Sequence, residues 1–394
     1  MSLVLPIANR RSACPTLDEP MQTGDGLLAR IRVAGGRIDP VRLEHLAVLC
    51  GSYGNGIIEI TARGNLQVRG LAEAAVPAFA REVRQLITVE TGLVVETPPL
   101  AGDDPLEFVD PRPLADAIKK LSAPFAARLG PKVAVIVDGN GQIGLAALKA
   151  DLRLVAVASD QWLVSVGPTL LGITSEPLDC ARIVLAALTA LGTEARAKDI
   201  DMLALVAVLG DLVAPSAPVQ QPTSSPIGRF ALFANSATGL GLPFGSIEWQ
   251  SIGALAEGAW RFGITEFRLA PHHGLLATGA RDSLQDEVAE VGFITHPNDP
   301  RTRVSACIGS AGCASGHIPA RGIAARLASC VAPQTHLHVS GCAKGCAHPQ
   351  RAALTLVGRP DGYGLVIEGM AGDTPVSVLR ADQLESAIGT AAQG

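Results

Sequence analysis

The sequence predicts an α+β fold that is built twice. Residues 37–70 and residues 246–279 share one pattern: a helix, a glycine break, an apolar strand, a polar turn and a second strand. Further along, residues 132–145 and 353–365 each fit a strand, a tight turn and a strand, because Asp138-Gly139 and Asp361-Gly362 supply turn residues. Hairpins of this kind build antiparallel or mixed sheets, so we expect two halves in which helices pack on such sheets.

The first of these repeats has an offset of 209 residues. In the second copy, apolar side chains recur at helical spacing from Ile252 to Trp260. Internal duplication explains the shared pattern, and coincidence is the alternative. Six identities support duplication: Ile38 with Ile247, Leu46 with Leu255, Ala47 with Ala256, Gly54 with Gly263, Leu66 with Leu275 and Gly70 with Gly279.

Composition limits the class of protein. The chain has 394 residues, which predicts two or three domains at roughly 150 residues each. Hydrophobic residues make up 48% and charged residues only 18%, so disorder over most of the chain is excluded. With 32 basic and 37 acidic residues the net charge is −5, which provides no general basic field for nucleic acid. Aromatic residues, at 4%, are too few for a base-stacking surface.

The sequence predicts neither a membrane span nor an export signal. The longest uninterrupted apolar run, residues 202–209, is about half as long as a bilayer requires. The short apolar stretch 3–7 precedes Arg10 and Arg11, the reverse of the order in a secretory signal. We therefore expect a cytoplasmic protein without a membrane partner. In that reducing compartment, clustered cysteines favour metal binding over disulfides.

A glycine motif at residues 139–144 fits the G-x-G-x-x-G pattern of dinucleotide sites, and Asp160 lies near the distance expected for a ribose-binding acid. The strand-like segment 152–157 follows almost at once, which leaves too little chain for a crossover helix. We therefore interpret the motif as a glycine-rich hairpin rather than a nucleotide site.

The strongest chemical signal is a set of four cysteines. Cys307 and Cys313 form C-x5-C, Cys342 and Cys346 form C-x3-C, and 28 residues separate the pairs. Four thiolates are the usual protein ligands of a cubane iron–sulfur cluster, and the glycines around them let two loops approach closely. Structural zinc, which favours tighter spacings, and unligated core cysteines are the alternatives.

At these residues the chain resembles the nitrite and sulfite reductase superfamily, whose members hold a [4Fe-4S] cluster beside sirohaem. The resemblance covers nearly the whole chain and includes a T-x-R-x-x-x-Q segment at residues 61–67. It implies an internally duplicated nitrite/sulfite reductase-like architecture, with ferredoxin-like half-domains and mixed α/β sheet domains. The implied segments are a half-domain at 1–75, an α+β sirohaem-type domain at 76–213, a Pro- and Ser-rich linker at 214–226, a second half-domain at 227–290 and an iron–sulfur-binding α+β domain at 291–394.

Within this superfamily the chain is most similar to the precorrin-3B synthase family of cobalamin biosynthesis, at residues 13–28, 98–104 and 340–349. Sulfite-reducing enzymes carry Asn between the last two cysteines, where this chain has Lys344. They also carry an arginine that is absent from residues 95–97, and two lysines where residues 129–134 retain only Lys132. Reduction of a small oxyanion needs several converging cations. These departures therefore favour a bulkier tetrapyrrole substrate.

The resemblance also implies the site residues. A [4Fe-4S] cluster would be held by Cys307, Cys313, Cys342 and Cys346. Arg63, Lys132 and Lys344 would hold substrate carboxylates, with a surface role as the alternative for Arg63. Arg69, Arg268 and Arg303 are further candidates. A mononuclear non-haem iron is implied as well; its ligands are unassigned, and His272, His273 and His348 are candidates.

The implied reaction uses O2 and two electrons to hydroxylate C20 of precorrin-3A, after which a ring acetate closes on the macrocycle as a γ-lactone. Because the chain has no convincing nucleotide motif, we expect a separate NADH-linked protein to donate the electrons. Two other functions stay open. One is an assimilatory sulfite or nitrite reductase that uses sirohaem, and the other is a non-catalytic iron–sulfur electron carrier or redox sensor.

Overall fold

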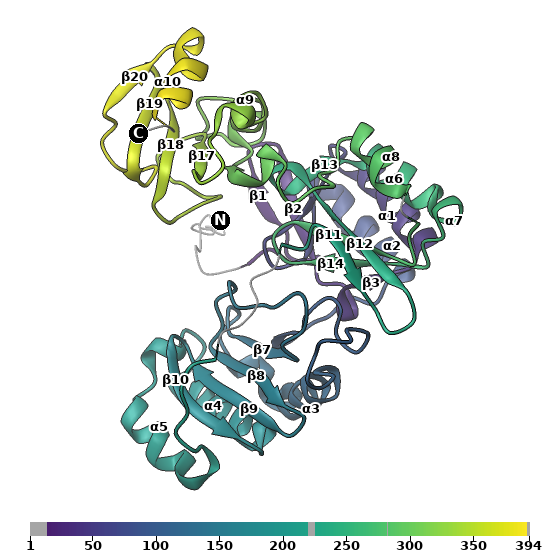
Figure 1. Ribbon diagram of the computed structural model, residues 1–394, viewed down its shortest axis with the longest axis vertical. Helices are drawn as coiled ribbons and strands as arrows, with labels where there is room; N and C mark the ends of the chain where they lie inside the picture. Colours follow the sequence, from purple (N-terminus) through teal and green to yellow (C-terminus); the bar gives the residue numbers. More distant parts are fainter. Residues whose placement is uncertain (1–13, 220–224, 282, 392–394) are drawn as a thin grey trace, which may run out of the picture.

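The computed structural model describes residues 14–219, 225–281 and 283–391, and four five-stranded sheets form its framework. Two sheets lie together in a central unit, from which a middle domain and a C-terminal domain project (Figure 1). The predicted α+β class is therefore confirmed. Residues 1–13, with the apolar stretch 3–7, and residues 220–224 of the predicted linker lie outside the described ranges.

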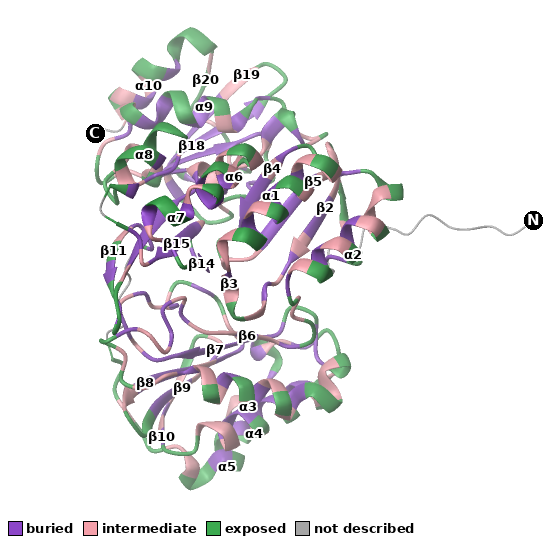
Figure 2. Cartoon of the chain, turned by 90° about the vertical axis from the view of Figure 1, so that its right-hand side faces the viewer, coloured by how far each residue is buried: buried purple, intermediate pink, exposed green. Residues whose placement is uncertain are grey.

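The first half-domain sheet has the strand order β1-β2-β5-β4-β13. Its strands are β1 (Met21–Thr23), β2 (Gly26–Ile31), β5 (Leu66–Leu71), β4 (Ile57–Ile60) and β13 (Ser246–Glu248). One face is covered by α1 (Pro40–Tyr53) and α2 (Val76–Leu86), whose outer sides are exposed (Figure 2). The helix α1 begins at Pro40 because the Asp39 side chain accepts the N–H of Arg42 at 3.0 Å, and proline needs no donor in the first turn.

The second half-domain sheet repeats this arrangement with the order β11-β12-β15-β14-β3. Its strands are β11 (Gly228–Ala231), β12 (Ser236–Gly241), β15 (Gly274–Thr278), β14 (Glu266–Ala270) and β3 (Arg37–Ile38). Its helices are α6 (Trp249–Glu257), α7 (Ala259–Phe262) and α8 (Leu284–Glu290). The offset of 209 residues places α1 on α6, β4 on β14 and β5 on β15 to within one residue at the start of each element.

The two half-domains exchange one strand each. β3 from the first repeat pairs antiparallel with β14, through Ile38 and Phe267. β13, its counterpart in the second repeat, pairs antiparallel with β4, through Ile247 and Ile58. The helices α1 and α6 pack on each other, so that one apolar core contains side chains of both repeats. The half-domains are therefore joined into one folding unit with two-fold pseudosymmetry.

The middle and C-terminal domains share one topology. In the middle domain β6 (Val94–Glu96), β7 (Ala134–Asp138) and β8 (Leu152–Ala158) are parallel, and β9 (Gln161–Val166) and β10 (Thr169–Thr174) continue antiparallel. In the C-terminal domain β16 (Val304–Ala306), β17 (Leu337–Ser340) and β18 (Ala352–Arg359) are parallel, followed by antiparallel β19 (Gly362–Gly369) and β20 (Ser377–Leu379). The helices are α3 (Arg112–Ser122), α4 (Pro177–Leu191) and α5 (Met202–Leu209) in the middle domain, and α9 (Ala320–Leu327) and α10 (Leu384–Ala391) in the C-terminal domain.

One predicted hairpin is confirmed and the other is wrong. β18 and β19 pair antiparallel around the turn between Arg359 and Gly362. In contrast, β7 and β8 are parallel, so residues 139–151 form a crossover loop and not a hairpin turn. The Asp138 carboxylate accepts the N–H groups of Asn140 and Leu145, each at 2.8 Å, which turns the chain away from β7. The glycine motif therefore shapes a loop that returns without a helix.

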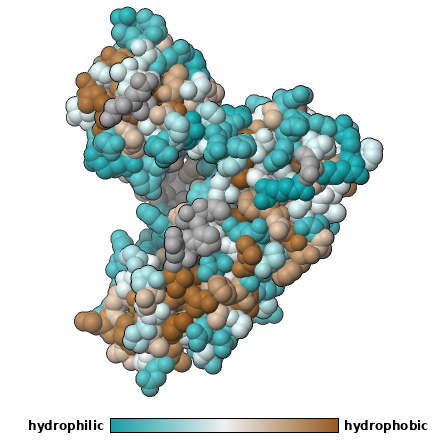
Figure 3. All heavy atoms as spheres, viewed as in Figure 1, coloured by the Kyte–Doolittle hydropathy of each residue, from teal (hydrophilic) through white to brown (hydrophobic). Residues whose placement is uncertain are grey.

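The surface of the molecule is hollowed between the C-terminal domain and the middle domain (Figure 3). None of the helices that the structure describes is long and apolar enough to cross a membrane.

Candidate functional site

Two adjacent loops of the C-terminal domain carry the four cysteines. Cys307 directly follows β16, and Cys342 lies two residues beyond the end of β17. Because β16 and β17 are parallel neighbours, their carboxyl ends meet at one edge of the sheet, where both loops begin. The backbone N–H of Gly341 donates to the Cys307 sulfur at 3.1 Å. The loops that carry C-x5-C and C-x3-C are thus in direct contact.

Glycines allow these loops to touch. A Cβ on Gly341 would lie 2.8 Å from the Cα of Gly309, and one on Gly316 would lie 2.5 Å from the carbonyl carbon of Gly309. Both separations are too short for a side chain, so glycine is required for this approach. The N–H of His317 also donates to the carbonyl of Gly341 at 2.8 Å, which fastens one loop to the other.

The cysteines influence one another electrostatically. Desolvation raises the pKa of the Cys346 thiol, and the nearby sulfurs of Cys342, Cys307 and Cys313 raise it further, whereas Lys344 opposes the shift. Four thiolates this close repel one another unless cations lie between them. Metal ligation deprotonates a thiol outright, and the positive charge of bound iron would offset the repulsion between the resulting thiolates.

The residues present fit a cluster. Among residues 14–219, 225–281 and 283–391, no three His, Cys, Asp or Glu side chains converge tightly enough to hold a single metal ion. A [4Fe-4S] cluster asks for less convergence, since each of its four thiolates binds a different iron atom. The donor set of four thiols on two contacting loops suits such a cluster, and its binding by Cys307, Cys313, Cys342 and Cys346 stays a prediction.

The structure does not bring the three histidine candidates together. His272 and His273 lie in the turn between β14 and β15, with φ angles of 55° and 65°, and His273 Nδ1 lies 2.6 Å from the carbonyl oxygen of Ile60. Burial lowers the pKa of both histidines. His348 lies instead in the second cysteine loop, where its ring centroid is 4.7 Å from that of His336 and 5.6 Å from that of His338.

The three predicted cationic residues also lie apart. Arg63, in the turn after β4, pairs with Glu96 of the middle domain and with the carbonyl of Lys149. Lys344 donates to the Ser315 hydroxyl at 2.9 Å, which links the two cysteine loops. Lys132 precedes β7 and lines a hollow of about 540 Å³ in the middle domain. Of the three, only Lys344 is therefore close to the cysteines.

A charged face of the first half-domain sheet was missed as a unit by sequence reasoning. Arg30 on β2, Glu59 on β4 and Gln67 on β5 point away from the helices. Arg30 donates to the side-chain oxygen Oε1 of Gln67 at 2.9 and 2.7 Å, and the side-chain amide of Gln67 donates to Glu59 at 2.7 Å. Glu59 also pairs with Arg69 at 3.8 Å and with Arg321 of α9. The network therefore runs from Arg30 to the C-terminal domain.

A cavity of about 450 Å³ opens beside Arg30. Its walls combine apolar groups with arginines, including Leu17, Arg30, Arg32, Arg84 and Leu129. Arg84 is paired with Asp18, and Arg32 with Glu90. Arg30 is hydrogen-bonded to a neutral amide instead of a carboxylate. Of these three arginines, it is therefore the one best able to bind a substrate carboxylate.

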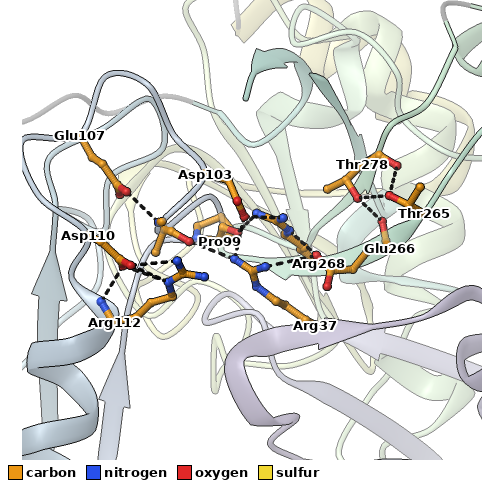
Figure 4. A network of polar contacts seen from close by, with 12 residues as sticks. Arg37, Pro99, Asp103, Glu107, Asp110, Arg112, Thr265, Glu266, Arg268 and Thr278 are labelled. Atoms are coloured by element: carbon orange, nitrogen blue, oxygen red, sulfur yellow. Dashed lines mark hydrogen bonds and ion pairs between the residues drawn. The ribbon is translucent and has the colours of Figure 1, made fainter. Parts of the chain in front are cut away.

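The matching face of the second half-domain sheet is covered. Asp103 of the middle domain binds Arg268 of β14 at 2.7 Å and Arg37 of β3 at 3.0 Å (Figure 4). Leu100 and Ile143 pack against Leu276 on the same face. Arg268, one of the further candidates for binding substrate carboxylates, thus forms an interdomain ion pair. Arg303, another, donates to the carbonyl oxygens of Asn298 and Val331.

The pattern that could have revealed the charged face is the alternation in β2 and β5. Ala29 and Ile31 are buried under the helices, whereas Arg30 and Arg32 lie between and after them. In β5, Leu66 and Val68 are core residues, whereas Gln67 and Arg69 face the other side. Charged residues on the second face of a half-domain sheet indicate that this face does not pack into the apolar core beneath the helices.

Comparison with known proteins agrees with this architecture. Residues 19–86 match the family described as the nitrite/sulfite reductase ferredoxin-like half domain. The NirA protein of Mycobacterium tuberculosis has a similar fold, with a TM-score of 0.66 and 19% sequence identity over 92% of this chain and 79% of that one. A precorrin-3B synthase from Sinorhizobium sp is 38% identical over 404 residues, covering 96% of this chain and 87% of that protein. The predicted resemblance is confirmed, and the chain belongs to the precorrin-3B synthase family, which has the nitrite and sulfite reductase fold.

Proposed function

We propose that this chain is an oxygen-dependent oxidoreductase that converts precorrin-3A into precorrin-3B. The observation that carries this function is the 38% identity to a precorrin-3B synthase over 96% of the chain. In the proposed reaction one atom of O2 enters the substrate at C20 and the other leaves as water. Two electrons and two protons are consumed, and a ring acetate closes as a γ-lactone.

The cysteine loops supply the redox part of the site. Cys307, Cys313, Cys342 and Cys346 would hold a [4Fe-4S] cluster, which passes single electrons when bound. The N–H of Gly341 donates to the Cys307 sulfur, so the second loop stabilises a ligand presented by the first. The NADH-linked electron donor and a mononuclear iron stay predictions of the resemblance.

The charged face of the first half-domain sheet supplies the substrate platform. Precorrins carry several acetate and propionate groups, and a guanidinium pairs with a carboxylate through two hydrogen bonds. Gln67 engages Nε and Nη2 of Arg30, which fixes the plane of the guanidinium and leaves Nη1 for a substrate carboxylate. The apolar part of the neighbouring cavity, with Leu17 and Leu129, suits the edge of a tetrapyrrole ring.

Lys344 has a supporting part in this proposal. Its ammonium group bridges the cysteine loops through Ser315 and opposes the raised pKa of Cys346. Arg63 is already paired with Glu96, so it would hold a substrate carboxylate only after exchanging that partner.

The test is turnover of precorrin-3A under ¹⁸O2 by protein purified and reconstituted without oxygen. We expect one ¹⁸O atom in the product and a broad iron–sulfur absorption without haem bands. Cys346→Ala should lose cluster and activity together, whereas Cys330→Ala, which changes a cysteine of the same domain outside the two motifs, should keep both. Sirohaem bands together with sulfite or nitrite reduction would instead establish the reductase alternative.

A further inference from the structure

The first half-domain reaches across to the cysteine loop of the other repeat. The turn between β1 and β2 contains Gly24, whose N–H donates to the carbonyl of Gly312 at 3.1 Å. A Cβ on Gly24 would lie 2.6 Å from the nitrogen of Ala314 and 2.8 Å from the Cα of Cys313. The two backbones are therefore in van der Waals contact beside one of the proposed cluster ligands.

A buried ion pair lies at this contact. Arg69 donates to Asp25 from Nε at 3.0 Å and from Nη2 at 2.9 Å, and their side chains are only 7% and 10% exposed. The same Nη2 donates to the carbonyl of Gly312 at 3.2 Å. Asp25 also accepts from Thr23 at 2.7 Å and from Asn55 at 2.9 Å. Both charges are thus fixed in place one residue from Cys313.

Arg69 of this pair interacts electrostatically with Cys313. Burial opposes ionisation of Arg69, but Asp25, Glu59 and the Cys313 thiolate raise its pKa in spite of that burial. Burial also works against the Asp25 carboxylate, and the hydrogen bonds from Arg69 and Thr23 nevertheless lower its pKa. Both groups therefore stay charged in a region with little water, where Coulomb interactions are strong.

The repeat shows that the fold does not require this pair. The offset of 209 residues places Thr278 at the position of Arg69 and Ala234 at the position of Asp25. The second half-domain keeps the same strands without either charge. The pair is therefore confined to the half-domain that touches the cysteine loop.

We propose that Arg69 is a positioning residue that raises the reduction potential of the cluster held by the four cysteines, and that Asp25 opposes it. The inference rests on the proposed cluster. Reduction adds one electron to the cluster and breaks no bond, so the reduced form carries one more negative charge. A buried cation one residue from a ligand stabilises that form, and a buried carboxylate destabilises it.

Three variants of the full-length, reconstituted protein separate charge from structure: Arg69→Gln, Asp25→Asn and the double variant. Their midpoint potentials would be measured at pH 8 by dithionite titration with mediator dyes, followed by electron paramagnetic resonance of the reduced cluster. We expect Arg69→Gln to disfavour reduction by about tenfold, which is about 59 mV for a one-electron couple. Asp25→Asn should shift the potential in the opposite direction, and the double variant should return toward wild type.

Controls decide between the possible outcomes. Arg69→Lys keeps the charge and should keep the potential, even if loss of the paired hydrogen bonds lowers stability. Arg196→Gln and Asp151→Asn change a similar pair in the middle domain, whose closest contact is 2.9 Å, and should leave the potential unchanged. Equal potentials in wild type, Arg69→Gln and Asp25→Asn would overturn the inference. Absence of a cluster from the wild-type protein would instead refute the proposed function.

Discussion

Gly341 donates its backbone N–H to the sulfur of Cys307, so the conformation of each cysteine loop depends on the other loop. The contact joins residues that are 34 positions apart in the chain, and it lies where the parallel strands β16 and β17 end. The position tolerates no side chain, because a Cβ would meet the Cα of Gly309 at 2.8 Å.

Gly341→Ala should therefore impair cluster binding. The added methyl group forces the loops apart and weakens the hydrogen bond to the Cys307 sulfur, so we expect less iron and acid-labile sulfide per chain and a lower Tm. Gly322→Ala is the matched control, because a Cβ at that position of α9 meets nothing within 4 Å. Removal of a helical glycine should stabilise the protein by about 0.4–1 kcal/mol. Equal iron content in Gly341→Ala and wild type would contradict the role of this contact.

Arg30→Ala should weaken substrate binding. A charge-assisted hydrogen bond contributes about 1.5–3 kcal/mol, so we expect the KM for precorrin-3A to rise roughly 10- to 100-fold. The cluster spectrum should not change, because Arg30 contacts Gln67 and not the cysteine loops. Arg380→Ala, at a guanidinium whose side chain is 75% exposed, serves as the control. A KM unchanged from wild type would remove Arg30 from the platform.

Glu59→Ala should destabilise the protein. The carboxylate is buried and pairs with Arg321 and, at 3.8 Å, with Arg69, so its removal leaves Arg321 without this ion pair and Arg69 with Asp25 alone. Breaking a buried ion pair in this way costs about 3–5 kcal/mol, which chemical unfolding can measure. Asp382→Ala removes an ion pair whose partners are 75% and 69% exposed, and it should cost far less stability, because solvent screens the two charges. Similar losses in both variants would show that Glu59 is not needed at this junction.

Glu107 should make stability depend on pH. Burial, together with Asp110 and Asp104, raises its pKa to about 7 although the N–H of Gly102 donates to it. Because the folded protein holds this proton more tightly than the unfolded chain, the stabilisation is present below pH 4.5 and is lost as the pH rises through 7. Glu107→Gln should therefore be more stable than wild type at pH 8, by on the order of 1–2 kcal/mol, and not at pH 4. Urea unfolding at both pH values measures this difference, and equal gains at both would contradict it.

Short-range features of the chain were predicted well. The cysteine loops follow from local spacing and glycine content, and the repeat at 209 residues follows from helices and strands that recur in order. The prediction of a hairpin at residues 132–145 was wrong. Asp138 fits a tight turn, but its carboxylate accepts backbone N–H groups of a crossover loop. A local turn signal does not show which strand the chain pairs with afterwards.

The substrate platform could not be predicted from local sequence, since its contacts are long-range. Arg30 and Gln67 are 37 residues apart, and Arg321 and Glu59 are 262 residues apart. The exchange of β3 and β13 gives no local signal either, because both strands look alike whichever sheet they join. Only the three-dimensional arrangement shows that Arg69 contacts the cysteine loop, through the carbonyl of Gly312.

The exchanged strands have a consequence for how the two copies diverged. Because each copy completes the sheet of the other, a mutation in either exchanged strand affects both copies. The two copies differ in segments outside the exchanged strands. One copy carries four cysteines in the loops after β16 and β17, whereas Asp103, after β6 of the other copy, binds Arg37 and Arg268.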